Sequence, residues 1–497
     1  MGVEFCADGT FCFRITHLQN SSESSSRGSD LIFKTAREQA RLIAKGEISS
    51  EELVNAHLAQ IDQVNPAVNA IVTLVADSAL DQACEADMAR MAGEEMGPLY
   101  GLPIAIKDLQ NTAGIRTTQG SPIYEHYVPI SDALIVERVK NAGAIVIGKS
   151  NTPEFGAGSQ TFNPVFGSTK NSYDVSKTCG GSSGGAGVAL ATGMTTIATG
   201  SDLGGSLRNP AAWSNVVGIR PSPGRVPSIN GDLGWSNLST DGPMGRTVDD
   251  VAFQLSVMAG HDNRSPLSIC ASGSQFADSL ERDFKGVRIA WSKNLGGRPI
   301  DAENSRVTEA QKHVFEDLGC VVEDDEPDLS STDEIFQSLR AYSFGIKHET
   351  HMRDHRDKMK ETVIWNAERG LQMSALELAY AERLRTRLWE QLMTFFDKYE
   401  FLALPVTSVP PFSIEDEYPT EINGVELETY LDWMWPCYTI SATGLPAMSV
   451  PAGFTKDGLP VGLQLVGRPR DEMGLLQLAS AFEGETNFHK QRPSVVE

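Results

Sequence analysis

Short apolar runs and longer segments of helical period alternate along the chain after about residue 30. Apolar runs of this length are typical of buried strands, and they predict strands at 102–106, 144–147, 195–199, 287–291, 321–322, 401–404, 448–450 and 461–466. The helical periods predict helices at 49–64, 131–142, 186–192, 247–259, 306–318 and 471–482. Ser49 and Thr247 are each followed three positions later by an acidic residue, which is the spacing of a helix-capping box. Strands that alternate with helices favour an α/β fold with helices on both faces of a sheet.

Three segments define the expected domain organisation. Residues 1–30 include a serine-rich tract that cannot bury a core, so we expect a disordered or weakly docked tail. Residues 31–497 are expected to form one large domain, since the chain shows no internal repeat. Within that domain, residues 332–398 keep a helical period throughout, which predicts a mainly helical insertion.

Composition excludes several classes of partner. The 497 residues include 42 Lys and Arg against 65 Asp and Glu, for a formal net charge of −23. Nucleic acid and anionic membrane surfaces would repel such a chain, so neither is expected to bind it. The seven cysteines form no CxxC pair, and no stretch is apolar enough to cross a bilayer. With no secretory signal at the N-terminus, the predicted location is the cytoplasm.

The segment 178–208 holds the strongest candidate for chemistry. Two glycine-flanked serines, Ser182 and Ser206, lie 24 positions apart in it, and glycines let a backbone turn tightly and approach a ligand. The backbone amides of Leu203, Gly204 and Gly205 precede Ser206. We expect them to form an oxyanion hole, which stabilises negative charge that develops in a transition state.

A serine hydroxyl needs a base before it can act as a nucleophile. None of the nine histidines lies beside the glycine-rich segment, whereas Lys107 follows the apolar run 102–106. A lysine is a base only when neutral, and lowering its pKa from about 10.4 to near 7 costs about 4 to 5 kcal/mol, which burial can supply. In the alternative interpretation Lys107 pairs with Asp108 at the surface, and the residues alone leave both open.

The motifs around these residues resemble the signature of the amidase signature family. The resemblance extends from about residue 33 to the C-terminus, and the spacings from Lys107 to Ser182 (75 positions) and from Ser182 to Ser206 agree with it. Five segments carry it: 102–108, 148–155, 180–185, 200–210 and 217–222. The resemblance implies one domain with a central mixed β-sheet covered by helices on both faces.

Roles for individual residues also follow from the resemblance. It implies Ser206 as the acylated nucleophile, Ser182 as a proton relay that is often held by a cis peptide bond, and Lys107 as the general base. It implies no cofactor and no metal. Three residues are expected to support this arrangement, the last two as an ion pair: Ser183, Asp202 and Arg208.

Three other motifs receive structural interpretations. The segment 143–150 fits a phosphate-binding loop by letter, but its interior is Ala-Ile-Val-Ile, which is strand sequence. A helical spacing of His348, Glu349, His351 and His355 could hold a metal, but the charged neighbours favour a solvated helix face. The acidic run 323–326 lacks the spacing of a calcium loop.

The expected function is hydrolysis of a carboxamide-type bond in a small molecule, which includes aryl amides, esters and carbamates. The alternatives are the glutaminase subunit of a tRNA-dependent amidotransferase and, less favoured, a scaffold without activity. Tyr124, Trp433 and Trp435 are candidates for an apolar substrate pocket, although core packing explains such aromatics equally well. A homodimer is a further expectation.

Overall fold

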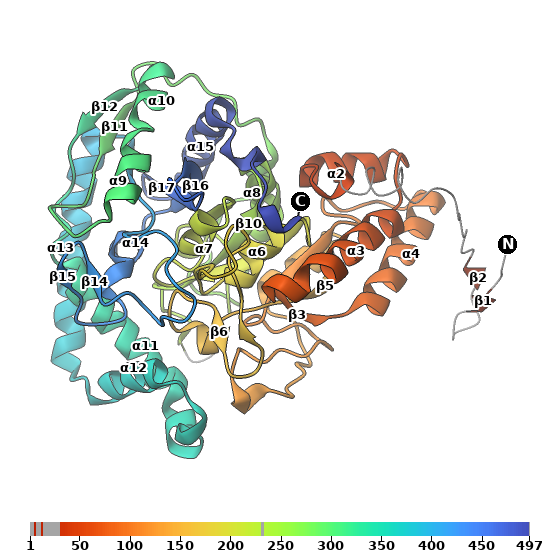
Figure 1. The fold of residues 1–497 in the computed structure, drawn as a ribbon, viewed down its shortest axis with the longest axis horizontal. Coiled ribbons are helices and arrows are strands. Elements are labelled where there is room, and N and C mark those ends of the chain that lie inside the picture. The colour runs from red at the N-terminus through yellow and green to blue at the C-terminus, as the bar shows by residue number, and fades with distance from the viewer. Residues whose placement is uncertain (1–3, 6–10, 13–29, 230–232, 497) are drawn as a thin grey trace.

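A mixed sheet of 11 strands runs through the computed structural model, which describes residues 4–5, 11–12, 30–229 and 233–496 (Figure 1). Across the sheet the strands follow the order β12 (Val321–Asp324), β11 (Arg288–Trp291), β13 (Phe401–Pro405), β17 (Pro460–Gly467), β16 (Ala447–Phe454), β9 (Val217–Arg220), β10 (Thr240–Gly245), β8 (Ile197–Asp202), β4 (Pro103–Lys107), β5 (Ile145–Ser150) and β3 (Ile71–Leu74). Three two-stranded ribbons are described besides: β1 (Glu4–Phe5) with β2 (Phe11–Cys12), β6 (Phe162–Asn163) with β7 (Gly167–Ser168), and β14 (Glu421–Ile422) with β15 (Val425–Glu426).

Parallel pairing is confined to two parts of the sheet. Strand β4 runs parallel to β5 and β8, and β11 runs parallel to β12 and β13. The strands between these groups pair antiparallel. Every residue of β4 and β5 is buried, as expected for parallel strands covered on both faces.

Helices cover both faces of the sheet (Figure 1). The α-helices are α2 (Ala36–Ala44), α3 (Ser50–Val68), α4 (Ala76–Ala92), α5 (Leu134–Asn141), α6 (Gly184–Ala191), α7 (Arg208–Trp213), α8 (Val248–Met258), α9 (Ala302–Glu309), α10 (Lys312–Asp317), α11 (Thr332–Asp354), α12 (Glu361–Gln372), α13 (Ala375–Lys398), α14 (Trp435–Thr443) and α15 (Glu472–Thr486). Single 3-10 turns lie at η1 (Pro122–Tyr124), η2 (Glu154–Gly156), η4 (Gly273–Ala277), η5 (Arg356–Lys358), η6 (Asp432–Met434), η7 (Phe488–Lys490) and η8 (Ser494–Val496).

Alternate residues of the strands enter separate cores, because successive side chains point to opposite faces. In β4, Ile104 and Ile106 join the core under α2, α5, α8 and α15. Ala105 between them joins the core under α3, α4 and α6. Farther along the sheet, Leu402 and Leu404 of β13 pack in a third core with α11, α13 and α14. The central strands of the sheet are therefore buried on both faces, whereas the edge strands β12 and β3 keep exposed residues.

The fold class expected from the sequence, an α/β sheet with helices on both faces, is confirmed. Both capping boxes are formed, by Ser49 with Glu52 and by Thr247 with Asp250. The single helix predicted at 306–318 is wrong, because the chain forms α9 and α10 with a break between them. At the end of α9 the Thr308 hydroxyl donates to backbone carbonyls of the preceding turn, and such bonds compete with regular helix.

The structure describes the expected insertion in full but only a few residues of the expected tail. Most of residues 1–30 lies outside the described residues, so the prediction for the tail is not addressed there. Residues 332–398 carry α11, α12 and α13, which lie together on one side of the molecule (Figure 1). None of the helices in the described part of the chain is long and apolar enough to span a bilayer.

Candidate active site

The candidate residues meet where the parallel strands β4 and β8 end. Lys107 is the last residue of β4. Asp202 is the last residue of β8, and Ser206 lies in the loop between β8 and α7. Ser182 and Ser183 immediately precede α6. In α/β sheets the carboxyl ends of parallel strands are the usual position for ligands, and here they bring together residues from three separate segments.

Lys107 lies at the centre of a cluster of hydroxyl groups. Its Nζ is 2.8 Å from Ser182 Oγ, 2.9 Å from Ser183 Oγ and 3.1 Å from Ser201 Oγ. The side chain has no exposed surface. Burial lowers the pKa of Lys107 to about 7, although Asp241 and Asp202 act in the opposite direction. Near neutral pH a large share of this lysine is therefore uncharged.

The loop that carries Ser206 is held against the serine segment. The Ser183 amide donates to the Ser206 carbonyl over 3.2 Å, and the peptide bond between Gly181 and Ser182 is cis. Ser206 retains 9% of its surface exposed, and Leu203 and Gly204 are partly exposed as well. Ser206 and the residues that carry two of the expected amide donors thus keep some solvent-exposed surface.

Gly205 differs from the other two residues of the expected oxyanion hole. It is buried, and its amide donates to Asp202 Oδ1 over 2.8 Å. Its φ of 122° and the position of the Cys437 side chain, 2.6 Å from where a Cβ would lie, explain why glycine stands there. Since this amide is already bonded to Asp202, the expectation of an oxyanion hole rests on Leu203 and Gly204.

Asp202 organises this loop through a buried charge cluster. Arg208 donates to its carboxylate from Nε over 3.0 Å and from Nη2 over 2.9 Å, and Arg220 Nη1 lies 3.2 Å from Oδ1. Burial alone would raise the pKa of Asp202, but the two guanidinium groups hold it well below its usual range. The pairing of Asp202 with Arg208 expected from the sequence is present, and Arg220 is an additional member.

Comparisons with known proteins agree with this geometry. The sequence model of the amidase family matches residues 52–476. The chain belongs to the amidase family. It is 33% identical to an acylamidase of Rhodococcus erythropolis over 94% of this chain and 98% of that protein. It is also 36% identical to one subunit of the glutamyl-tRNA(Gln) amidotransferase of Carboxydothermus hydrogenoformans, over 94% of this chain and 100% of that protein.

Solved structures of other amidases share the fold. A bacterial aryl acylamidase of the amidase signature family superposes with a TM-score of 0.87 at 27% identity, covering 93% of this chain and 99% of that one. A 6-aminohexanoate cyclic dimer hydrolase superposes with a TM-score of 0.84 at 25% identity, over 94% and 100%. The family, the fold and the enzyme class expected from the sequence, a hydrolase of amide C–N bonds, are thereby confirmed.

Helix α11 closes one side of this amidase site. The Phe336 ring lies against Gly204, with Cζ 2.7 Å from where a Cβ on that glycine would be. Leu203 and Phe155 pack on a small core around Phe344 of the same helix. Gly156, next to Phe155, lies beside Ser182, because a Cβ there would come within 3.3 Å of Ser182 Oγ. Aromatic side chains therefore border the serines on the α11 side.

The three aromatic residues proposed for the pocket have different positions. Tyr124 is half-buried at this border, where its ring meets Phe155 edge-on and its hydroxyl lies 2.9 Å from His351 Nε2. Trp433 is 1% exposed and stacks on Trp213 at 5.4 Å, and Trp435 is equally buried. Both tryptophans belong to the core around α13 and α14. Of the two interpretations open for them, the structure therefore favours core packing over pocket lining.

The structure also describes the segment that resembles a phosphate-binding loop by letter and the histidines at helical spacing. The run 145–150 is strand β5, and Lys149 in it is buried, with Nζ donating to the Gln110 carbonyl over 2.6 Å. His348 and His351 hydrogen-bond to each other through Nδ1 atoms 3.1 Å apart. Within the described ranges, no group of three or more His, Cys, Asp or Glu residues is placed to hold a metal ion.

Several residues that contact the site had no role predicted from the sequence. Ser201 lies within the glycine-rich motif but was given no role, although its hydroxyl contacts Lys107. Arg220 likewise lies in a matching segment, 217–222, and had no assigned role. Gln110 and Asp241 carry no sequence signal, since neither belongs to a motif. Only the sheet register brings Asp241 opposite Ser201.

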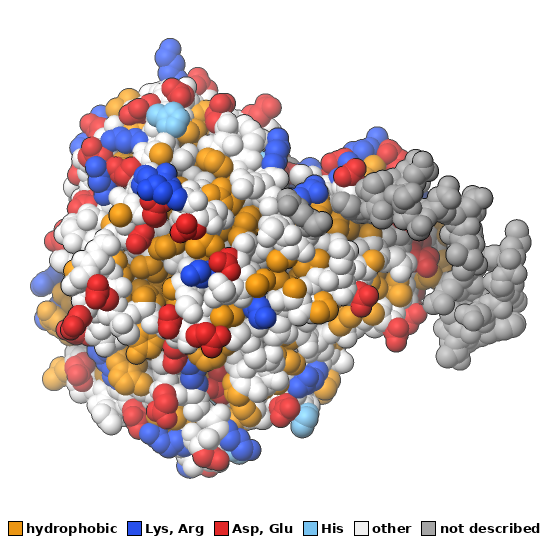
Figure 2. All heavy atoms as spheres, viewed as in Figure 1, with side chains coloured by type: hydrophobic (Ala, Val, Ile, Leu, Met, Phe, Trp, Pro, Cys, Tyr) orange, Lys and Arg blue, Asp and Glu red, His pale blue; other side chains and the backbone are white. Residues whose placement is uncertain are grey.

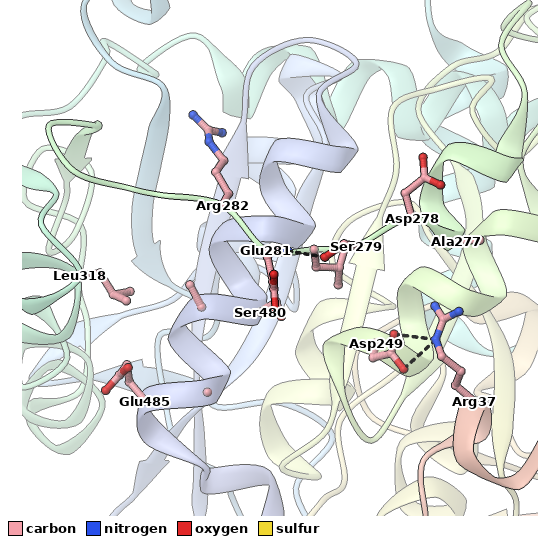
Figure 3. A pocket seen from close by; sticks show the side chains of 13 residues that line it. Arg37, Asp249, Ala277, Asp278, Ser279, Glu281, Arg282, Leu318, Ser480 and Glu485 are labelled. Atoms are coloured by element: carbon pink, nitrogen blue, oxygen red, sulfur yellow. Dashed lines mark hydrogen bonds and ion pairs between the residues drawn. The ribbon is translucent and has the colours of Figure 1, made fainter. Parts of the chain in front are cut away.

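The molecular surface has features that are separate from this site. A groove of about 740 Å³ lies between α8 and α15, where Arg37 pairs with Asp249 (Figure 3). None of the residues that line it belongs to the candidate active site. On the face seen in Figure 2, the described Lys and Arg side chains are scattered among acidic ones without a continuous basic patch.

Proposed function

We propose that this amidase cleaves a carboxamide-type bond of a small molecule through an acyl-enzyme on Ser206. Lys107 is the general base and Ser182 relays protons between Lys107 and Ser206. The observation that carries the proposal is the 2.8 Å contact between Lys107 Nζ and Ser182 Oγ inside a buried site that lowers the pKa of the lysine to about 7. A neutral amine at this distance can accept the serine proton.

In the first half of the reaction, Ser206 Oγ attacks the substrate carbonyl carbon. Its proton passes to Ser182 Oγ, and the proton of Ser182 passes to Lys107. The net result is that Lys107 is protonated and Ser182 is unchanged. The resulting oxyanion is stabilised by the amides of Leu203 and Gly204, for which each donor contributes about 2.7 to 4 kcal/mol in comparable sites. The positive charge gained by Lys107 remains in the buried cluster until the next step.

In the second half, the tetrahedral intermediate loses its amine. Lys107 returns the proton through Ser182 to the leaving nitrogen, the C–N bond breaks, and Ser206 is left as an ester. Water then attacks this ester with Lys107 again accepting a proton, and the acid is released as Ser206 is restored. A carbamate substrate would pass through a carbamoyl-enzyme by the same steps.

The favoured substrate class is an aryl or acyl amide, with esters and carbamates as chemically related alternatives. Two proteins that this chain resembles carry the names acylamidase and aryl acylamidase. In addition, the site border formed by Tyr124, Phe155 and Leu203 is largely apolar. Apolar walls with a few polar groups are typical of pockets for small organic ligands.

The test uses Ser206→Ala and Lys107→Ala on a panel of aryl amides, esters and carbamates, with Ser272→Ala as a matched surface control. We expect both site variants to lose at least about 10³-fold in kcat/KM, and the wild type to show a burst of released amine and a covalent mass increase on Ser206. The control should keep wild-type activity. Undiminished hydrolysis by both site variants would refute the proposal.

A second candidate is the glutaminase subunit of a tRNA-dependent amidotransferase. It is favoured by the 36% identity to one subunit of a glutamyl-tRNA(Gln) amidotransferase over nearly all of both chains. This candidate predicts weak hydrolysis of glutamine by the isolated chain and co-purification with an ATP-using partner. Efficient turnover of aryl amides by the chain alone would decide for the first candidate. A cytoplasmic location and a homodimer stay predictions.

A further inference from the structure

A thiol, an imidazole and a carboxamide meet on the loop between α8 and η4. Cys270 Sγ lies 3.5 Å from His261 Nδ1, and His261 Nε2 lies 2.9 Å from Asn263 Oδ1. All three residues are exposed, and the proposed amidase reaction uses none of them. Some hydrolases use a cysteine, a histidine and an asparagine as nucleophile, base and orienting group. Here the three groups lie on an open surface, where a small molecule in solution can reach them.

The side chain of Asn263 decides which nitrogen of His261 carries the proton. An amide oxygen only accepts hydrogen bonds, so Nε2 is the N–H donor of the neutral ring. Nδ1 then has a lone pair, and the Cys270 thiol is the donor that lies next to it. His261 is therefore oriented to accept the thiol proton.

The loop is anchored to the body of the protein next to both reacting groups. Arg138 Nη2 donates to the His261 carbonyl over 3.1 Å. The amide of Ile269, the residue before Cys270, donates to the Gly224 carbonyl over 3.0 Å. Groups that are already held in place lose little freedom when they react, which favours reaction.

The surroundings of Cys270 differ from those of the other cysteines that the structure describes as free thiols. Three of these are buried, and burial raises the pKa of each thiol: Cys179, Cys320 and Cys437. Cys84 is partly buried, and its Sγ lies 4.0 Å from Glu51 Oε2, a carboxylate oxygen that disfavours a thiolate. Among these five thiols, Cys270 is the one that combines exposure with a neighbouring base.

We propose that Cys270 is a modification site that exchanges with small disulfides, with His261 as its base and Asn263 as a positioning residue. Cys270 gives its proton to His261 Nδ1, and the thiolate attacks one sulfur of the disulfide. A bond forms between that sulfur and Cys270, and the original S–S bond breaks. The departing thiolate takes the proton from His261. Cys270 is thereby oxidised to a mixed disulfide, and the released sulfur is reduced to a thiol.

The test follows the reaction of the full chain with hydroxyethyl disulfide, a neutral probe, at pH 7. Peptide mass spectrometry gives a separate rate constant for each cysteine. Cys270 should react faster than Cys84. His261→Ala should slow the reaction of Cys270 by about tenfold, because an unassisted thiol is only a few per cent ionised at this pH. Asn263→Ala should slow it by a smaller factor, and Asn263→Asp, which keeps an accepting oxygen, should restore the rate.

Matched variants separate the base from simple exposure. His313→Ala removes another exposed histidine and should leave the rate at Cys270 unchanged. Cys270→Ser should abolish modification at this position and leave amide hydrolysis unchanged, so the result does not depend on the proposed function.

The outcome for His261→Ala decides the proposal. A rate at Cys270 within about twofold of wild type would show that exposure alone controls the reaction, and it would overturn the proposal. If His261→Ala does not fold, the fall in Asn263→Ala and its recovery in Asn263→Asp decide instead. An unchanged rate in Asn263→Ala would overturn the positioning role of Asn263.

Discussion

Replacement of Lys107 by methionine should change how the stability of the protein depends on pH. Burial lowers the pKa of Lys107 to about 7 from an ordinary value of 10.5. Between these two values the unfolded chain binds more protons at this residue than the folded protein does. Stability must therefore rise with pH across this window, and the cost of keeping Lys107 buried is fully present below pH 7.

The size of the effect follows from the two pKa values. The full displacement corresponds to about 5 kcal/mol at 1.36 kcal/mol per pH unit. Between pH 7 and pH 9, Lys107 contributes about 2 kcal/mol to the rise in the free energy of unfolding. The contribution is smaller than the full displacement of about 5 kcal/mol because half of the folded protein already carries a neutral lysine at pH 7. Methionine has a similar length and no charge, so Lys107→Met should lose this part of the pH dependence. Its lost hydrogen bonds to three serines add an offset that changes little with pH.

Urea unfolding followed by tryptophan fluorescence at several pH values measures this difference. The free energy of unfolding should rise from pH 7 to pH 9 by about 2 kcal/mol less in Lys107→Met than in the wild type. Lys149→Met should show a similar loss, because burial lowers the pKa of Lys149 to about 7 as well. Lys456→Met removes a lysine that is 76% exposed and serves as the control. Parallel curves for wild type and Lys107→Met would refute the view that the folded protein holds Lys107 neutral.

Three further predictions concern the site and its supports. The kcat/KM of the wild type should rise with pH through about 7 as Lys107 loses its proton, and a flat profile from pH 6 to 8 would contradict a lysine base. Asp202→Asn should lower the free energy of unfolding, measured in urea, by about 3 to 5 kcal/mol, because it leaves two buried arginines without their carboxylate. Asp249→Asn removes one partner of an exposed ion pair and should lower the same quantity by about 1 kcal/mol or less. Gly204→Ala places a Cβ about 2.7 Å from the Phe336 ring, so kcat/KM should fall at least about tenfold, and the added substitution Phe336→Leu should recover much of it.

Several strands whose residues are all buried could be predicted from the sequence, because burial on both faces favours a continuous apolar run. Strands β4, β5 and β17 are of this kind. Strand β10 was missed since its sequence, Thr-Asp-Gly-Pro-Met-Gly, reads as a turn. It forms a strand nonetheless because Gly242 lies against the backbone of β9, where a Cβ would come within 2.7 Å of the Ile219 carbonyl oxygen. Tertiary packing overrode local preference there.

Some features of the site come from residues that are close in the sequence, and others come from residues that only the fold brings together. Ser182, Ser206 and their glycines lie in one short stretch, so their spacing could be recognised from the order of residues alone. The charge of Lys107 depends instead on residues that the sequence separates from it. Asp241 stands opposite Ser201, whose hydroxyl contacts Lys107, only through the register of β8 and β10. A motif can therefore identify which atoms react, while the pH at which they react depends on contacts that only the folded chain creates.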